Sequence, residues 1–246
     1  MKNLIVGNFK MNSTVHEFAN YIDEFLPKVK ANKNNIALCV PYTHLMLAGQ
    51  KLVSTNIQYG SQNISTEEKG ALTGEISNLM VKDLGANFTL VGHSERRTKF
   101  KETNEQTNQK IIRALGVNLK VILCIGETKS EKNAKKTKAV LKKQLEDALK
   151  GLYENELKNI IVAYEPVWAI GTGLVPTNKE IEQTVQDIRD ILCEDFSEKA
   201  AEKMCVLYGG SVNQDNSSTI LKIKGVNGLL VGGACLSSES FANICK

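Results

Sequence analysis

Residues 159–173 have the sequence NIIVAYEPVWAIGTG. Its apolar first part predicts a buried strand, and a single carboxylate, Glu165, follows the strand directly before Pro166. A proline favours an extended backbone at the residue before it, whereas Gly171 and Gly173 supply free backbone dihedrals and bare amides. The segment therefore predicts a strand that presents a base for proton abstraction beneath a mobile loop.

The same order of elements, a short apolar run and then an amphipathic helix, recurs along the whole chain. Apolar residues return every three or four positions in 15–29, 141–152 and 181–192, which predicts helices with one buried face. Strands that are continuously apolar are typical of a parallel sheet covered by helices. Eight strands are predicted, at Leu4–Val6, Ile36–Val40, Ile57–Gly60, Phe88–Val91, Lys120–Cys124, Ile160–Tyr164, Met204–Tyr208 and Gly228–Val231.

Hydroxyl or amide side chains precede several helical runs, where they can accept hydrogen bonds from the free amides of the first turn. Eight strand and helix units in 246 residues, without a linker-like stretch, favour a closed barrel over an open sheet. We therefore predict one α/β catalytic domain, residues 1–246, folded as a single (β/α)8 TIM barrel with a parallel eight-stranded sheet and eight outer helices. The predicted helix caps are Ser13 or Thr14, Ser77, Thr103, Thr177 and Asn213.

The composition limits the classes of partner. With 42% hydrophobic and 24% charged residues, the chain can bury a substantial core. Its net charge of +4 is too small to indicate a nucleic-acid or membrane partner, and an anionic small molecule fits as well. The lysine-rich stretch 129–143 lacks interleaved aromatic residues, so we interpret it as a solvated helix face. No apolar run is long enough to span a membrane and no signal peptide precedes the first strand, which predicts a cytoplasmic protein.

The cysteines do not form a metal or disulfide pattern. They are scattered without a C-x-x-C spacing, and most lie in or beside predicted strands, so we expect reduced thiols. Cys124 ends a predicted strand and so lies near a site, but we interpret it as a packed core thiol. The six cysteines are Cys39, Cys124, Cys193, Cys205, Cys235 and Cys245.

In a closed parallel barrel, functional side chains come from the carboxyl ends of the strands. Asn8 and Lys10 follow the first predicted strand, His93 follows the fourth, and Glu165 follows the sixth. These residues are far apart in the sequence, yet the fold predicts that they converge. Burial beneath the apolar loop would make Glu165 a stronger base for a carbon acid.

The three histidines have different predicted roles. His93 opens the sequence HSERR, so its ring is expected at a strand end and at a helix N-terminus, where the positive dipole disfavours the imidazolium form. A neutral imidazole can donate a hydrogen bond to a substrate carbonyl and to the oxyanion that replaces it. His16 and His44 are interpreted as structural.

Lys10 has several possible roles at the mouth of a barrel. It can be a Schiff-base nucleophile, an electrostatic anchor or a surface charge. Asn8 is two residues away, so an extended segment would project both side chains to the same side. Glu95 is a plausible ion-pair partner that would hold Lys10 charged and argue against an amine nucleophile.

Glycine-rich turns follow the last two strands. Gly209, Gly210 and Ser211 come after the seventh strand, and Gly232 and Gly233 come after the eighth. Bare amides at this edge of a barrel can bind a phosphate group. Two such turns on adjacent strands predict a phosphate site.

Residues 61–76, SQNISTEEKGALTGEI, are too long and too polar for a simple connection between a strand and a helix. The segment could form a protruding hairpin that inserts into a partner subunit, or it could be a surface loop. Composition alone does not decide between these two alternatives.

Six motifs occur in an order that resembles the triosephosphate isomerase family over the whole chain. They are GNFKMN (7–12), VGHSERR (91–97), CIGET (124–128), YEPVWAIGTG (164–173), LYGGSV (207–212) and LLVGGA (229–234). The resemblance implies interconversion of dihydroxyacetone phosphate and D-glyceraldehyde 3-phosphate through an enediol, in glycolysis and gluconeogenesis. It implies no metal and no organic cofactor. The family is itself a standard example of a loop that closes over the reacting groups.

The resemblance also implies a role for each matching residue. Glu165 would move the proton between two adjacent carbons, His93 would polarise the carbonyl, Lys10 would balance negative charge and Asn8 would orient the substrate. Closure of 166–175 would exclude water. The implied homodimer would give the excursion a purpose, with Thr73 reaching the partner's active site. Within the same chain, Glu95 would support Lys10. Phosphate would be held by Gly171, Ser211, Gly232 and Gly233.

The chain departs from the family pattern outside the proposed catalytic groups. Phe9 replaces a usual tryptophan, Leu72 a common aromatic residue and Lys101 a frequent glycine. Pro176 ends an unusual loop hinge, 174–176, and should stiffen it. Two alternatives remain at this point: a Schiff-base aldolase, and a noncatalytic barrel that binds phosphate.

Overall fold

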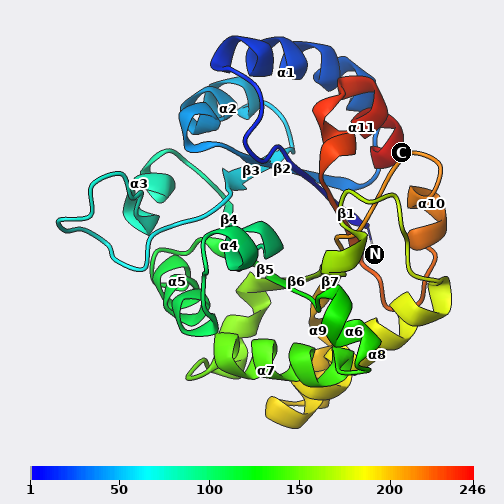
Figure 1. Ribbon diagram of the computed structural model, residues 1–246. Coiled ribbons are helices and arrows are strands. Elements are labelled where there is room, and N and C mark those ends of the chain that lie inside the picture. The colour runs from blue at the N-terminus through cyan, green and yellow to red at the C-terminus, as the bar shows by residue number, and fades with distance from the viewer. Residues whose placement is uncertain (1) are drawn as a thin grey trace.

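The computed structural model describes residues 2–246, and Met1, where the predicted domain begins, lies outside the described residues. Eight parallel strands form a closed barrel in sequence order, and β8 pairs with β1 (Figure 1). This confirms the predicted (β/α)8 TIM barrel. The strands are β1 (Leu4–Asn8), β2 (Asn35–Val40), β3 (Gln58–Ser61), β4 (Phe88–Val91), β5 (Lys120–Ile125), β6 (Ile160–Tyr164), β7 (Cys205–Tyr208) and β8 (Gly228–Val231).

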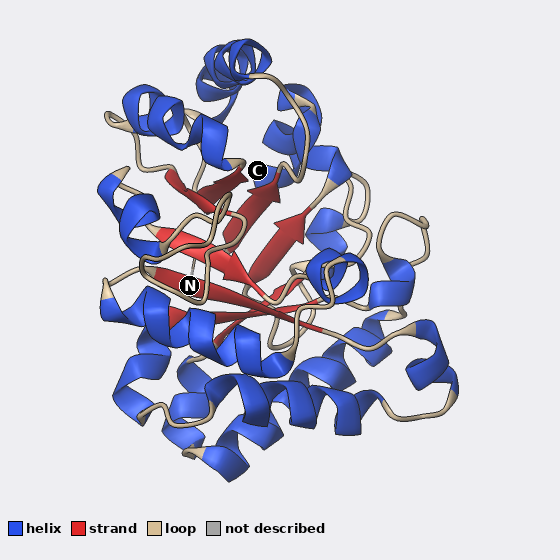
Figure 2. Cartoon of the chain, turned by 60° about the vertical axis from the view of Figure 1, so that its left-hand side comes forward, coloured by secondary structure: helices blue, strands red, loops and turns tan. Residues whose placement is uncertain are grey.

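Helices surround the barrel on its outside (Figure 2). Between residues 2 and 246 there are eleven α-helices rather than eight, because short capped helices such as α4 and α6 precede the longer ones. They are α1 (Val15–Val29), α2 (Leu45–Leu52), α3 (Asn78–Asp83), α4 (Ser94–Lys99), α5 (Asn104–Gly116), α6 (Lys129–Asn133), α7 (Thr137–Leu149), α8 (Asn178–Asp195), α9 (Glu198–Lys203), α10 (Ser217–Ile220) and α11 (Ser238–Cys245). Four 3-10 helices complete the described chain: η1 (Tyr42–His44), η2 (Glu154–Asn159), η3 (Val167–Ala169) and η4 (Gly233–Leu236).

Most of the predicted caps are confirmed. Thr14 caps α1, and the side chains of Ser77, Thr103 and Thr177 accept hydrogen bonds from the first turns of α3, α5 and α8. The prediction for Asn213 was wrong, because α10 begins only at Ser217. The Asn213 side chain instead accepts from the amides of residues 215 and 216, which closes the preceding turn.

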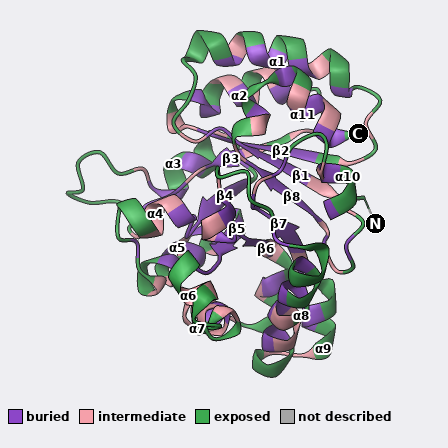
Figure 3. Cartoon of the chain, turned by 45° about the vertical axis from the view of Figure 1, so that its right-hand side comes forward, coloured by how far each residue is buried: buried purple, intermediate pink, exposed green. Residues whose placement is uncertain are grey.

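Two apolar layers explain why the strands are continuously apolar. One cluster fills the barrel interior and includes Val6, Leu90 and Leu230, while the other lies between the sheet and the helices. The strands are therefore buried on both faces, as Figure 3 shows in purple. All six cysteines within the described chain are free thiols, and burial raises the pKa of Cys124 well above its usual value, which confirms the packed core thiol. Among residues 2–246, none of the helices has the length and apolar content needed to cross a membrane.

The long connection between β3 and α3 projects from the barrel (Figure 1) and is exposed at its tip (Figure 3). Its base is closed by a hydrogen bond from the Ser65 amide to the Ile76 carbonyl, 2.8 Å long. Thr73 lies exposed near the tip. The excursion is therefore a projection whose base is closed by a backbone hydrogen bond and whose tip, with Thr73, is exposed.

Candidate active site

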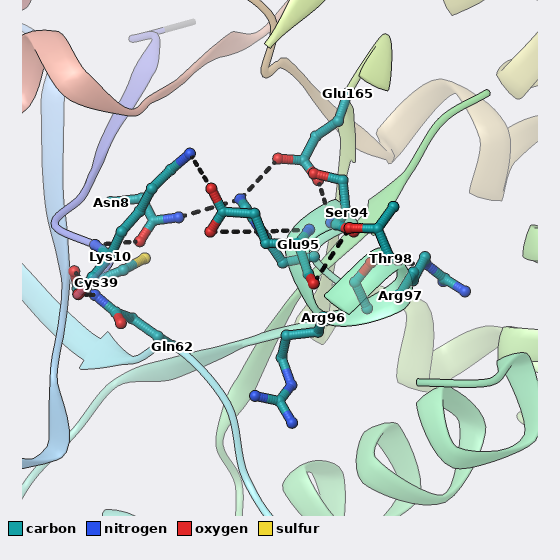
Figure 4. Close-up of polar contacts among 12 residues, drawn as sticks. Asn8, Lys10, Cys39, Gln62, Ser94, Glu95, Arg96, Arg97, Thr98 and Glu165 are labelled. Atoms are coloured by element: carbon teal, nitrogen blue, oxygen red, sulfur yellow. Dashed lines mark hydrogen bonds and ion pairs between the residues drawn. The ribbon is translucent and has the colours of Figure 1, made fainter. Parts of the chain in front are cut away.

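The predicted polar side chains converge at the carboxyl ends of β1, β4 and β6. His93 Nε2 lies 3.0 Å from Glu165 Oε1 and 3.3 Å from Asn8 Nδ2. All three residues are buried. In Figure 4, Lys10 and Glu165 reach the site from opposite sides, with Glu95 between them. The structure thus brings together residues that are 157 positions apart in the sequence, 8 against 165.

Glycines directly after the two neighbouring strands, β5 and β7, let Glu165 take its position. A Cβ at Gly126 would lie 1.7 Å from the backbone oxygen of Glu165, closer than any two such atoms can approach. At Gly209 the added atom would lie 3.0 Å from Cγ of Glu165. The loops after β5 and β7 can therefore pack against Glu165 only because these positions lack a side chain. The Glu165 side chain is 3% exposed.

The hydrogen bonds of His93 define which ring nitrogen faces the site. The backbone amide of Glu95, in the first turn of α4, donates to Nδ1 over 3.3 Å. Since Nδ1 accepts this bond, the neutral ring carries its proton on Nε2, which faces Glu165. The positive end of α4 was predicted to favour a neutral imidazole, and this geometry fits that form.

The direct contact between His93 and Glu165 reverses the pKa directions expected from the sequence. Burial lowers the pKa of His93, but the adjacent carboxylate raises it, and the net direction is upward. Burial raises the pKa of Glu165, but His93, the Ser94 amide and Lys10 together lower it below its usual value. The sequence predicted burial correctly and missed the contact, so it predicted a stronger base than the resting site contains.

Lys10 is held by the predicted ion pair. Its ammonium lies 2.7 Å from Glu95 Oε1, which confirms the expected partner. The Lys10 backbone has φ of 53°, in the left-handed region, and its amide donates to Asn8 Oδ1 over 3.1 Å. The backbone turn after β1 therefore fixes Asn8 and Lys10 relative to each other, and Asn8 can present only its NH2 group to His93.

The predicted phosphate residues are less enclosed. Ser211 and Gly232 are half-buried, and Gly171 and Gly233 are exposed. The Ser211 hydroxyl donates over 2.5 Å to the carbonyl of Ala169, at the start of the loop that follows Glu165. Gly232 lies beside Lys10, because a Cβ there would be 3.4 Å from Lys10 Cε. The loop after β7 thus contacts the loop after β6, and the loop after β8 contacts Lys10.

The loop after β6 has fixed ends and a free tip. Pro166, Ala169 and Pro176 are buried, whereas 171–175 is exposed. Gly171 and Gly173 have φ of 67° and 78°, values that residues with a side chain rarely adopt. The two glycines therefore use the backbone freedom that the sequence predicted for them. This tip is suited to move on a fixed base.

Sequence reasoning missed two residues that hold the first end of this loop. Glu127 is buried and accepts a hydrogen bond from the indole of Trp168 over 2.8 Å. Lys132, predicted to lie on a solvated face, places its ammonium 3.7 Å from the Trp168 ring centre and pairs with Glu180. The aromatic residue after Glu165 was the available signal, because an indole N–H beside a site needs an acceptor.

No group of three His, Cys, Asp or Glu side chains suited to a metal ion lies within the part of the chain that the structure describes. The polar groups at the site are N–H donors, one ammonium and two carboxylates, of which Glu95 is paired with the ammonium and Glu165 faces His93. Such a set can bind an anion and exchange a proton with it.

Comparison with known proteins agrees with this geometry. The family model described as triosephosphate isomerase matches residues 3–246. A triosephosphate isomerase of Caldanaerobacter subterraneus is 42% identical over 98% of this chain and 97% of its own length. One from Malacoplasma penetrans is 41% identical over 100% and 98%. The crystal structure of triosephosphate isomerase from Bartonella henselae superposes with a TM-score of 0.89 at 34% identity, covering 100% of this chain and 98% of that one.

Proposed function

This chain belongs to the triosephosphate isomerase family, and we infer from that premise that it interconverts dihydroxyacetone phosphate and D-glyceraldehyde 3-phosphate through an enediol. It is an intramolecular aldose–ketose isomerase of glycolysis and gluconeogenesis, and we expect it to work in the cytoplasm with those pathways. The observation that carries the mechanism is the buried Glu165 carboxylate facing His93 Nε2 at 3.0 Å. We propose that residues 1–246 act as one catalytic domain.

Substrate binding has to separate this pair. A distance of 3.0 Å between Glu165 Oε1 and His93 Nε2 leaves no room for a reacting carbon, so the carboxylate must move when substrate enters. The move also breaks the 3.1 Å bond from the Ser94 amide. Loss of these two contacts removes the main interactions that lower the pKa of Glu165, so that only Lys10 still opposes the burial that raises it. The base therefore becomes stronger only after substrate is bound.

His93 and Asn8 supply the oxyanion site. Their N–H groups are 3.3 Å apart and can both point at one carbonyl oxygen of the substrate. Separation from Glu165 removes the main contact that raises the pKa of His93. Burial and Lys10, which lower this pKa, are then opposed only by Glu95 and favour the neutral ring. A neutral ring donates to the enediolate oxygen while Glu165 carries the proton between the two carbons.

Lys10 neutralises charge and does not act as an amine nucleophile. Its ammonium is ion-paired with Glu95 at 2.7 Å, so the nitrogen lone pair needed for a Schiff base is protonated. The phosphate would lie against Gly232 and Gly233 beside Lys10. Ser211 would leave the Ala169 carbonyl and donate to the phosphate when the loop closes, with Gly171 supplying an amide. Closure excludes water, which protects the enediol phosphate from eliminating its phosphate.

A homodimer fits the excursion after β3. A hollow of about 220 Å³ opens beside Lys10 and Glu95 and is lined also by Met11 and Phe100. These two apolar side chains are 96% and 67% exposed, which favours a covering partner. Thr73 of a second copy could enter this hollow. Sedimentation velocity should give a dimer for wild type and a monomer for Thr73→Arg, while a wild-type monomer would exclude this arrangement.

An isomerase assay coupled to glycerol 3-phosphate formation tests the function. Wild type should turn over D-glyceraldehyde 3-phosphate, and borohydride should trap no substrate on Lys10. Trapping on Lys10, with no isomerisation, would instead support the Schiff-base aldolase. Binding of triose phosphate without isomerisation or proton exchange would support a noncatalytic barrel.

A further inference from the structure

The peptide that precedes His93 is held from two sides by charged groups. Gly92 is buried with φ of 72°, and its amide donates to Glu102 Oε1 over 3.0 Å. Its carbonyl accepts from Arg97 Nε over 2.7 Å. The backbone entering His93 is therefore fixed by an anion on one side and a cation on the other.

Glu102 is a charged group in the interior. Its side chain is 2% exposed and lies 2.6 Å from both Lys110 Nζ and Arg96 Nε. Burial raises the pKa of Glu102, but these two cations lower it below its usual value, so the carboxylate is ionised at neutral pH. Lys110 also donates to Asn63 Oδ1 over 2.8 Å, which joins the network to the base of the excursion.

A buried ionic network is a poor way to gain stability, because apolar side chains of the same volume serve as well or better. An apolar side chain cannot accept the hydrogen bond that the Gly92 amide donates. An ionised carboxylate makes the stronger bond to that amide, and its two cations fix the position of the carboxylate. The network is thus suited to placing one peptide group accurately.

We propose that Glu102 is a positioning residue that sets the His93 imidazole through the Gly92 amide. This inference rests on the proposed function. The ring has little independent freedom, because the Glu95 amide in the same turn donates to Nδ1. A shift of the 92–95 backbone therefore moves Nε2 relative to the substrate oxygen. Errors of about 1 Å in such contacts cost up to about 100-fold in rate.

The test compares Glu102→Asp and Glu102→Gln with a matched control. The aspartate keeps the charge for Lys110 and Arg96 but is too short to reach Gly92 as well, whereas the glutamine keeps the length and loses the charge. For either variant we expect kcat to fall about tenfold with KM changed less than about twofold, because the substrate still binds to the displaced site. Glu102→Asp keeps a negative charge beside the two cations, so it serves if the glutamine variant does not fold.

The control is Arg189→Met. Arg189 donates to backbone carbonyls of Ala201, Met204 and Gly225 near the N-terminal ends of β7 and β8, at the end of the barrel opposite the site. Its loss should lower the melting temperature and leave kcat within about twofold once corrected for the folded fraction.

Nitrogen-15 NMR of labelled histidine gives a readout that stability does not move. The chain has three histidines, and His93→Gln assigns the His93 signals by their loss. We expect the His93 ring signals to shift in both Glu102 variants and to stay unchanged in Arg189→Met. Unchanged ring signals with wild-type kcat in folded Glu102 variants would overturn the proposal, as would equal losses of kcat in Arg189→Met. An inactive wild type would contradict the proposed function instead, and the NMR comparison would still decide the role of Glu102.

Discussion

The site has a preformed half and an open half. Asn8, His93 and Glu165 are buried, and His93 contacts both of the others. The open half, where we propose that phosphate binds, is built from half-buried or exposed residues such as Gly171 and Gly233, and the Ser211 hydroxyl is bonded to the loop itself. Proton transfer requires accurate geometry, so its groups are fixed by strands, whereas sealing the substrate from water requires a part that moves. Each half should therefore respond differently to mutation.

Shortening the base in the preformed half should have the largest effect. Glu165→Asp keeps the charge but withdraws the carboxylate by about 1 Å, and we expect kcat to fall about 100-fold with KM almost unchanged. Steady-state kinetics in both directions measure this. Glu154→Asp, on the exposed surface, is the matched control and should behave as wild type. A loss confined to KM would contradict the role of Glu165 as the base.

Filling the space beside the preformed half should reduce stability. Gly126→Ala places a Cβ 1.7 Å from the Glu165 backbone oxygen, so the backbone must shift. We expect the free energy of unfolding to fall by about 3 kcal/mol, with a loss of kcat because Glu165 moves. Urea unfolding and kinetics on the same samples test this, and an unchanged stability would show that the strand-end packing is softer than the structure indicates.

The corresponding change in the open half should leave the stability of the fold almost unchanged. Gly173→Ala adds a side chain where φ is 78°, at a cost of about 1 kcal/mol in an exposed tip that can relax. We expect a melting temperature close to that of wild type and kcat/KM reduced about fivefold, because the tip must adopt one shape on closure. A large drop in melting temperature would mean that the tip is part of the rigid scaffold.

The hinge proline should have a smaller effect. Pro176 is buried at the C-terminal end of the loop and removes backbone freedom there. Pro176→Ala should speed loop opening about threefold or less. Trp168 is the only tryptophan in the chain and lies at the other end of the loop, so temperature-jump fluorescence with a bound substrate analogue reports the motion directly. Slower opening in the variant would contradict the stiffening role of the proline.

Separation of Glu165 from His93 should be visible as a change in pKa. The contacts with His93 and the Ser94 amide hold the pKa of Glu165 below its usual value, so this carboxylate protonates at a lower pH than an ordinary glutamate. With glycerol 3-phosphate bound, which has no carbonyl and cannot react, the pKa should rise, and protonation should occur at higher pH. Carbon-13 NMR of labelled glutamate, assigned with Glu165→Gln, measures both values. A lower pKa in the complex would contradict the separation.

The same division explains how much the sequence could predict. Strands β4, β6 and β8 were predicted to the residue, because continuous apolar runs are bounded by polar or glycine residues. Asn8, Lys10, His93 and Glu165 could be placed at one mouth of the barrel because parallel strands end together. The ion pair between Lys10 and Glu95 was also predicted and is confirmed.

Contacts between distant side chains could not be predicted in the same way. The approach of Glu165 to His93, which sets both pKa directions, depends on side-chain placement across the barrel. Glu102 gave no signal, because a glutamate before a helix is ordinarily exposed and its burial depends on Lys110, eight residues away. The prediction that Asn213 caps a helix was wrong, because an asparagine side chain can accept a hydrogen bond from a following backbone amide in a turn just as it can at the start of a helix.

Solvent deuterium exchange tests the central claim most directly. The claim is that Glu165 removes a carbon-bound proton from a triose phosphate whose carbonyl is held by His93. In D2O, wild type should incorporate deuterium into dihydroxyacetone phosphate at C1, and Glu165→Gln should not, although it should still bind glycerol 3-phosphate. Deuterium incorporation by Glu165→Gln at the wild-type rate would contradict the account.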